Sequence, residues 1–291
     1  MTLEVQDGAL LEALRALRWP ARRRAGAGVQ GSQHSRRRGL SEEFAEYRPY
    51  RPGEDTRRID WKLFGRTDRA FVRQSTDRTL LSTMILVDAS ASLAYPIDTL
   101  EKWNFARHIA LGLAAAAHCG GDPVGLALAG SRTMLLPPRT RRDVVSTMAR
   151  ALREVRPAGI AELAPVFARQ RDRARIAIVS DFLGDTASLL DLTGAFAAAG
   201  KEVYAIHVIH QHEANPPKTF SVLTDPEQPE MRRPMTDATR HRYLENFGAW
   251  CQHLARDWRR RGAYYTRVVT YEPPAHAVRR VVQSDAERAS A

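Results

Sequence analysis

The stretch Ile85-Leu-Val-Asp-Ala-Ser-Ala-Ser-Leu93 decides the fold, because an apolar run ends in one carboxylate followed by two alternating hydroxyls. The residues before Asp88, Thr83-Met-Ile-Leu-Val87, carry no charge and are typical of a strand buried on both faces of a parallel sheet. Open α/β sheets bind their ligands in the loops at the carboxyl ends of such strands. We therefore expect Asp88, Ser90 and Ser92 to share one loop at that edge, where their oxygens would suit a hard cation.

A second apolar run ends in the same way. Arg175-Ile-Ala-Ile-Val-Ser-Asp181 places Ser180 and Asp181 directly after a short strand. Two parallel strands of one sheet would then end in carboxylates at the same edge. The alternative is that these residues only cap helices, since Asp and Ser are also favoured at helix N-termini.

The pattern D-x-S-x-S at Asp88, Ser90 and Ser92 resembles the metal-ion-dependent adhesion site of von Willebrand factor A-like domains. That resemblance implies Mg²⁺ or Mn²⁺ held directly or through water, with an open position for a carboxylate of a partner protein. It also implies a further aspartate from a later strand, a place that Asp181 occupies. The threonine that many such domains place in an earlier loop is absent from Val155-Arg-Pro-Ala-Gly-Ile-Ala161. We expect one position of the metal site to be missing or filled by water.

The segment Tyr47-Arg-Pro-Tyr-Arg-Pro-Gly-Glu-Asp-Thr-Arg-Arg-Ile-Asp-Trp61 is rich in opposite charges. It resembles the signature of domain-of-unknown-function family 58, whose members carry a von Willebrand A-like domain. The residues themselves favour an ion-pair network that clamps an N-terminal arm onto the core. The alternative is a surface for docking a partner. The residues of this signature that we single out are Arg48, Asp55, Arg57, Asp60 and Trp61.

The family resemblance implies a non-enzymatic, metal-assisted protein-interaction module that works as an adaptor with a MoxR-type AAA+ ATPase and an unidentified client protein. Two alternatives stay open, a metal-dependent phosphohydrolase and a metal-free structural scaffold. Phosphatases with an aspartate nucleophile typically have a second aspartate two positions later, where this chain has Ser90. The sequence also lacks a glycine-rich phosphate loop and a G-x-S-x-G elbow.

Composition narrows the partners and the compartment. A chain of 291 residues with 44% hydrophobic content can bury a full core, and two cysteines do not indicate a disulfide framework. Glu4 and Asp7 stand where a secretory signal needs positive charge, so we expect a cytoplasmic protein without a membrane span. The net charge of +11 invites nucleic-acid binding. Because 40 arginines stand against 4 lysines, we read this charge as a compositional bias and expect no nucleic-acid partner.

The periodicities predict an α/β fold with a mostly parallel, von Willebrand A-like sheet flanked by helices and an N-terminal arm. We place the arm at residues 1–78, with a helix over Leu3 to Trp19, a basic loop at 21–39 and the signature segment packed on the core. Residues 79–291 form the main domain. A proline-rich, irregular insertion is expected at 211–234.

Overall fold

The computed structural model describes residues 3–21, 46–51, 56–74, 80–184, 186–218, 222–224, 232–234 and 236–283. The chain divides into two units. Unit 1 comprises Met1–Ala25 and Leu80–Ala291, and unit 2 comprises Gly26–Thr79. The basic loop predicted at 21–39 lies almost entirely outside the described residues. Whether the signature segment packs on the core stays a prediction.

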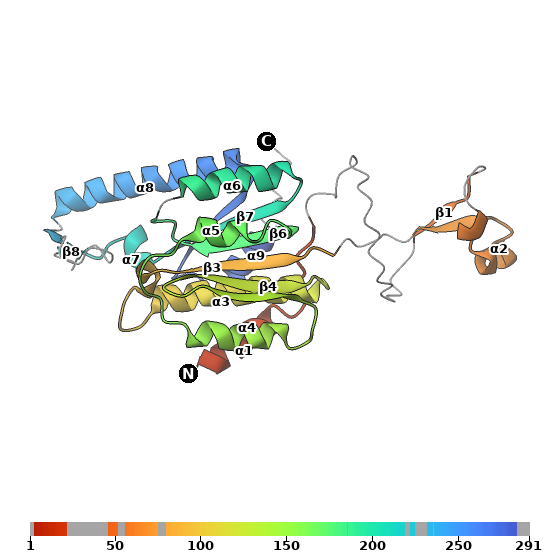
Figure 1. Ribbon diagram of the computed structural model, residues 1–291, viewed down its shortest axis with the longest axis horizontal. Coiled ribbons are helices and arrows are strands. Elements are labelled where there is room, and N and C mark those ends of the chain that lie inside the picture. Colours follow the sequence, from red (N-terminus) through yellow and green to blue (C-terminus); the bar gives the residue numbers. More distant parts are fainter. Residues whose placement is uncertain are drawn as a thin grey trace. The chain divides into compact units, whose positions relative to one another are not determined.

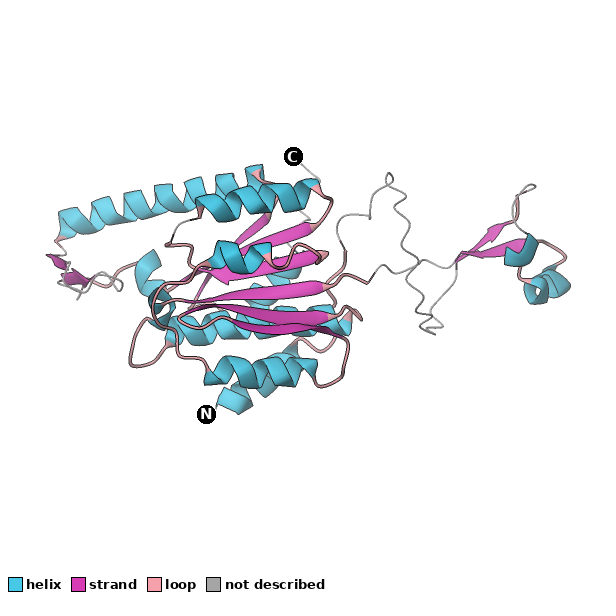
Figure 2. Ribbon diagram, viewed as in Figure 1, coloured by secondary structure: helices cyan, strands magenta, loops and turns pink. Residues whose placement is uncertain are grey.

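A six-stranded sheet in the order β10-β7-β6-β3-β4-β5 forms the centre of unit 1 (Figure 2). Five strands are parallel, and β5 runs antiparallel to β4 as the outer member of a hairpin. The predicted fold class, a mostly parallel sheet flanked by helices, is confirmed. The strands are β3 (Thr83–Ala89), β4 (Val124–Gly130), β5 (Met134–Arg139), β6 (Arg175–Ser180), β7 (Glu202–Ile209) and β10 (Tyr264–Val269).

Helices cover both faces of this sheet (Figure 1). Because successive side chains of a strand point to opposite faces, Ile85 and Val87 join one core while Met84 and Leu86 join the other. The first core contains side chains of α1 (Leu3–Ala13), α3 (Glu101–Cys119), α4 (Val144–Glu154) and α9 (Pro274–Gln283). The second contains side chains of α5 (Leu163–Ala168), α6 (Ala187–Ala198) and α8 (Asp237–Arg260).

A buried ionic group closes the amino edge of the sheet. Arg175, the first residue of β6, donates to Glu202 Oε2 at 3.0 Å and to Asp122 Oδ2 at 3.1 Å. Its second terminal nitrogen donates to the carbonyl of Pro20 at 2.9 Å, and its guanidinium lies 4.6 Å from the ring centroid of Trp19. We call Arg175, Asp122 and Glu202 the amino-edge cluster.

The N-terminal helix is shorter than predicted, because α1 ends at Ala13 rather than at Trp19. The chain beyond it runs to the amino edge, where the Trp19 amide donates to the Ala116 carbonyl at 3.1 Å. Helix α1 is clasped to α3 by Asp7, which accepts from Arg107 at 2.7 and 3.0 Å. The free energy gained by burying Trp19 against the sheet thus exceeds the gain from extending α1 to Trp19.

The insertion after β7 is partly regular, which corrects the prediction of an irregular segment. It begins with the short helix α7 (Gln211–Ala214), and β8 (Val222–Thr224) pairs antiparallel with β9 (Arg232–Pro234). The side chain of His210 accepts the backbone N–H of His212 at 3.1 Å, so α7 has a capped start that its composition did not reveal.

Within unit 2, β1 (Glu46–Pro49) pairs antiparallel with β2 (Phe71–Gln74). A 3₁₀ turn, η1 (Thr56–Arg58), and the helix α2 (Trp61–Thr67) lie between them in the sequence. No helix in the described part of the chain has the length and apolar character needed to cross a membrane.

Candidate metal site at the carboxyl edge

The loop after β3 brings Asp88, Ser90 and Ser92 together, as predicted. Asp88 accepts the Ser90 amide at 2.8 Å, and the hydroxyl oxygens of Ser90 and Ser92 lie 2.9 Å apart. Asp88 also accepts the hydroxyl of Ser180, from the end of β6, at 2.5 Å. All four side chains are at most 5% exposed. The two strand ends therefore form one buried site.

Asp181 follows Ser180 and acts electrostatically on Asp88. The pKa of Asp88 is raised to about 6, first by burial and then by the negative charge of Asp181, while the hydrogen bonds from Ser180 and Ser90 oppose the rise. The negative charges of Asp88 and Asp181 are thus not fully balanced by positive charge nearby. A bound cation would relieve that imbalance.

Lys102 supplies one positive charge to the site, and the sequence prediction missed it. Its ammonium is fully buried and lies 2.7 Å from Asp181 Oδ2 and 2.7 Å from Glu213 Oε1. Burial lowers the pKa of Lys102, but Asp181 and Glu213 together outweigh burial and raise it. The one signal in the sequence is its rarity, since Lys102 is one of four lysines among 44 basic residues. We call Asp88, Lys102, Asp181 and Glu213 the carboxyl-edge cluster.

Glu213 comes from α7, at the start of the insertion. Its second carboxylate oxygen accepts the His210 amide at 2.7 Å, and its own carbonyl accepts the hydroxyl of Tyr243, on α8, at 3.0 Å. Glu213 therefore both caps α7 and binds Lys102. Through this carboxylate the insertion contacts the site.

The loop expected to lack a threonine does lie beside the site. Ala158 donates to the Ala89 carbonyl at 3.0 Å, and Ala91 donates to the Gly159 carbonyl at 2.9 Å. Gly159 has a φ of +67°, which glycine adopts without strain. This loop therefore offers backbone atoms and no hydroxyl side chain to the site.

The donor set fits a small divalent cation. Neighbouring ligands of an octahedral ion at about 2.0–2.1 Å lie about 2.9 Å from each other. The Ser90 and Ser92 hydroxyl oxygens have that separation, 2.9 Å. Among the described residues no group of three or more His, Cys, Asp or Glu side chains is arranged to hold a metal. A site here would instead rest on the two carboxylates of Asp88 and Asp181 with the two serine hydroxyls.

Exposed apolar side chains lie on the loops of the same edge. Ile97, which follows the Ser92 loop, is 85% exposed, Ile160 beside Gly159 is 72% exposed, and Leu183 just after Asp181 is 48% exposed. We call Ile97, Ile160 and Leu183 the apolar rim. Large apolar side chains in water around a buried polar site are typical of a surface that meets another protein.

The signature segment lies in unit 2, apart in sequence from these loops. Asp60 caps α2, because its carboxylate accepts the amides of Lys62 and Leu63 at 3.0 Å each. Trp61 is 62% exposed and meets the ring of Phe64 edge-on at 5.9 Å. Arg57 is exposed, Arg48 lies in β1, and Asp55 lies outside the described residues. Asp60 thus has a structural task, and Trp61 is available for contact.

Solved structures similar to this chain have low sequence identity. A conserved hypothetical protein BatB from Bacteroides thetaiotaomicron is 13% identical, with a TM-score of 0.43 over 72% of this chain and 100% of that one. A von Willebrand factor type A protein from Catenulispora acidiphila is 9% identical, with a TM-score of 0.41 over 71% and 42%. Proximal thread matrix protein 1 from the mussel byssus, in a structure with a zinc-occupied MIDAS motif, is 11% identical, with a TM-score of 0.41 over 70% and 47%.

Closer relatives are found by sequence. Uncharacterized proteins of Mycobacterium tuberculosis and Mycobacterium bovis are each 31% identical over 228 residues, which is 76% of this chain and 71% of theirs. The model of the family described as "Protein of unknown function DUF58" matches residues 46–249. This match runs from the signature segment through the carboxyl-edge loops to α8. The chain therefore belongs to the DUF58 family, as the resemblance of its signature segment implied.

Proposed function

We propose that the protein is a non-enzymatic interaction module that docks a partner protein at the carboxyl edge, with Mg²⁺ or Mn²⁺ held by Asp88, Ser90, Ser92 and Asp181. The observation that carries this proposal is the pair of serine hydroxyls 2.9 Å apart beside a buried carboxylate. A bound ion would supply a coordination position for a carboxylate of the partner.

The charges of the site support this reading. With Asp88, Asp181 and Glu213 ionised and Lys102 protonated, the carboxyl-edge cluster has a net charge of 1 − 3 = −2. A divalent cation neutralises that sum. Lys102 holds Asp181 in place, and the hydroxyls of Ser90 and Ser92 bond to each other beside Asp88. The residues therefore prepare the site for one added ion.

The apolar rim supplies the docking surface in this proposal. Ile97, Ile160 and Leu183 belong to three different loops of one edge, so a partner that reaches the site also covers apolar area. Each buried apolar side chain contributes about 1.5–3 kcal/mol. We propose a partner segment with an Asp or Glu flanked by apolar residues.

The phosphohydrolase alternative has less support. Asp88 is 4% exposed, and its two oxygens already accept from Ser90 and Ser180. A nucleophile has to approach the phosphorus of its substrate directly, which this burial obstructs. The metal-free scaffold is the second candidate function, because Lys102 already provides a cation and the 155–161 loop provides no hydroxyl.

Two finer points belong to the proposal. The partner that the family resemblance implies is a MoxR-type AAA+ ATPase, together with an unidentified client, and the compartment that we propose is the cytoplasm. A purified ATPase of that type is the first partner to test. The substitution Ile160→Asp on the apolar rim should abolish its binding, and Val5→Asp, at another exposed apolar position on α1, should not.

The metal is tested by thermal unfolding of wild type, Asp88→Asn and the control Asp98→Asn, with Mg²⁺, Mn²⁺ or Ca²⁺. Asp98 is exposed in the segment that follows the serines. An ion at about 100 times its Kd stabilises the folded state by about 2.7 kcal/mol. We expect Tm to rise in wild type and in Asp98→Asn and to stay constant in Asp88→Asn. An equal rise in all three proteins, or no rise with any cation, would refute the metal and favour the scaffold.

A further inference from the structure

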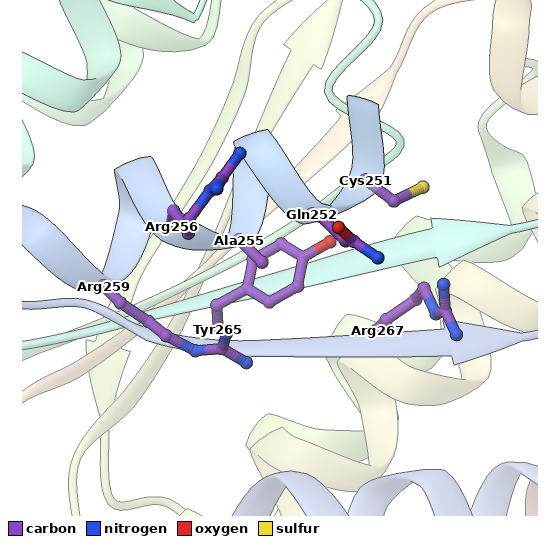
Figure 3. A pocket seen from close by; sticks show the side chains of 7 residues that line it. All are labelled: Cys251, Gln252, Ala255, Arg256, Arg259, Tyr265 and Arg267. Carbon is purple, nitrogen blue, oxygen red and sulfur yellow. The ribbon is translucent and has the colours of Figure 1, made fainter. Parts of the chain in front are cut away.

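A second feature lies on the flank of the sheet, away from the carboxyl-edge loops. An open hollow of about 450 Å³ lies between α8 and the edge strand β10 (Figure 3). Arg256 and Arg259 reach it from α8, and Tyr265 and Arg267 reach it from β10. Three of its lining side chains are thus arginines, and none is an aspartate or a glutamate.

These three arginines differ from other arginines near them. Arg261, just beyond α8, pairs with Asp191 at 2.8 Å, and Arg280 on α9 pairs with Glu272 at 2.8 Å. In the described part of the chain, Arg256, Arg259 and Arg267 have no carboxylate within 4.0 Å. The hollow therefore concentrates positive charge that the folded chain leaves without a counter-ion.

The wall of the hollow is held in place from beneath. The hydroxyl of Tyr265 lies 2.6 Å from Nδ1 of His207 on β7. Burial lowers the pKa of His207 to about 3, so the ring is neutral, and the imidazole also bonds to the backbone of Asp181. The guanidinium of Arg259 lies 5.6 Å from the centroid of the Tyr265 ring. A ligand would meet an ordered wall, which reduces the entropy lost on binding.

We propose that this hollow is an anion site that binds the phosphate groups of a small phosphorylated molecule. Guanidinium groups present planar pairs of N–H donors that match phosphate oxygens, and several of them together balance a dianion or a diphosphate. The hollow is larger than one phosphate and falls within the usual range of about 300–1,000 Å³ for small-ligand sites. The site is separate from the metal proposal and does not depend on it.

The geometry favours a small ligand over a polynucleotide. The three arginines line one hollow from two neighbouring elements. A backbone-tracking site would need a groove with aromatic platforms for successive bases. Here one ring, Tyr265, lines the hollow and already lies beside Arg259.

The test is calorimetric titration of the full-length chain with pyrophosphate, inorganic phosphate and ADP, at about 150 mM salt to screen loose surface charge. The variants are Arg259→Gln and Arg267→Gln. The matched control is Arg260→Gln, because Arg260 is an exposed neighbour on the same helix that does not line the hollow. Unchanged Tm values show that all variants are folded.

We expect saturable binding of pyrophosphate or ADP that weakens at least about tenfold in Arg259→Gln and Arg267→Gln and less than about twofold in Arg260→Gln. Tighter binding of ADP than of pyrophosphate would identify a nucleotide, and the reverse a bare diphosphate. Binding should persist in Asp88→Asn, which separates this site from the metal site. No saturation up to about 10 mM of any probe, or equal weakening in the control, overturns the proposal. Preferential binding of a single-stranded oligonucleotide overturns it as well.

Discussion

The sheet buries an ionic cluster at each end, and the two clusters are similar in composition. They differ in how far groups of the chain itself balance their charges. At the amino edge, Arg175 donates to Glu202, Asp122 and the Pro20 carbonyl, and Trp19 covers it. At the carboxyl edge, Lys102 binds two carboxylates while the serine hydroxyls bond to each other. The first cluster has its cation bonded to both carboxylates and to the backbone, and the second has more negative charge than its one cation balances.

The two clusters also differ in net charge and in the surface that surrounds them. The amino-edge cluster has one cation and two anions, a sum of −1, and Asp122 also accepts the Leu81 amide at 2.9 Å. The carboxyl-edge cluster has a sum of −2 and is surrounded by loops with exposed apolar side chains. Buried charge is therefore not by itself a mark of function. The larger excess of negative charge and the exposed apolar loops around it distinguish the functional candidate.

We expect the largest effect at the amino-edge cluster, whose cation bonds to both carboxylates. Arg175→Met should lower the free energy of unfolding by about 3–5 kcal/mol, because it leaves Asp122 and Glu202 buried without a cation. Urea denaturation measures this change. The Mg²⁺-dependent rise in Tm should survive in the variant, or in Arg175→Lys if Arg175→Met does not fold. If a folded variant lost that rise in Tm, the two edges of the sheet would be coupled. The distinction drawn between the two clusters would then be wrong.

Lys102→Met should have a smaller effect, a loss of about 2–3 kcal/mol without metal, because Glu213 keeps partial access to water. The cluster would then carry a net charge of −3, so Mg²⁺ should bind more tightly and restore part of the loss. Denaturation and calorimetry with and without Mg²⁺ measure both quantities. Lys201→Met, at a lysine just before β7, is the control and should alter neither. Weaker Mg²⁺ binding in Lys102→Met would contradict the proposed role of Lys102 as a counter-ion.

The smallest effect is expected from pH, at the contacts of Asp7 that hold α1 against α3. Like the amino-edge cluster, this group of charges is paired within the chain. The pKa of His108 is lowered to about 4, first by burial and then by the positive charge of Arg107, while Asp7 opposes the shift. Arg153 of α4 also reaches Asp7, at 3.3 Å. Between about pH 6.5 and pH 4 the unfolded chain binds a proton that the folded chain does not. The fold is therefore most stable above about pH 6.5 and loses about 2 kcal/mol of stability by about pH 5, with the loss continuing toward pH 4.

Stability curves from pH 7.5 to 4 for wild type, His108→Gln and the control His118→Gln test this expectation. His118 lies at the exposed end of the same helix. The loss on acidification should be smaller in His108→Gln alone. An unchanged slope in that variant would mean that other groups set the acid response.

The sheet and the carboxyl-edge loops could be predicted because their signals are local. Uncharged runs such as Thr83–Val87 and Ile176–Val179 fix buried strands, and parallel strands necessarily bring Asp88 and Asp181 to one edge. These inferences need only neighbouring residues and the rule for parallel sheets.

The counter-ion could not be predicted because its contacts are distant in sequence. Lys102 meets Asp181 across 79 positions and Glu213 across 111, and Glu213 belongs to a short helix in a segment that composition marks as irregular. The early end of α1 has a similar cause, since the place of Trp19 is set by Arg175 and Tyr204 rather than by its neighbours. Tertiary contacts between distant residues decided both.

The amino-edge cluster also fixes where the chain leaves unit 1 and where it returns. Arg175 holds the Pro20 carbonyl, Asp122 holds the Leu81 amide, and these two side chains lie 3.1 Å apart. Unit 2 is thus an insertion whose two junctions are fastened at one point of its host. Replacing residues 22–79 by a short glycine-serine linker should leave the sheet, the metal site and the arginine hollow intact. The segment that carries the DUF58 signature could then be removed and added back as a separate polypeptide.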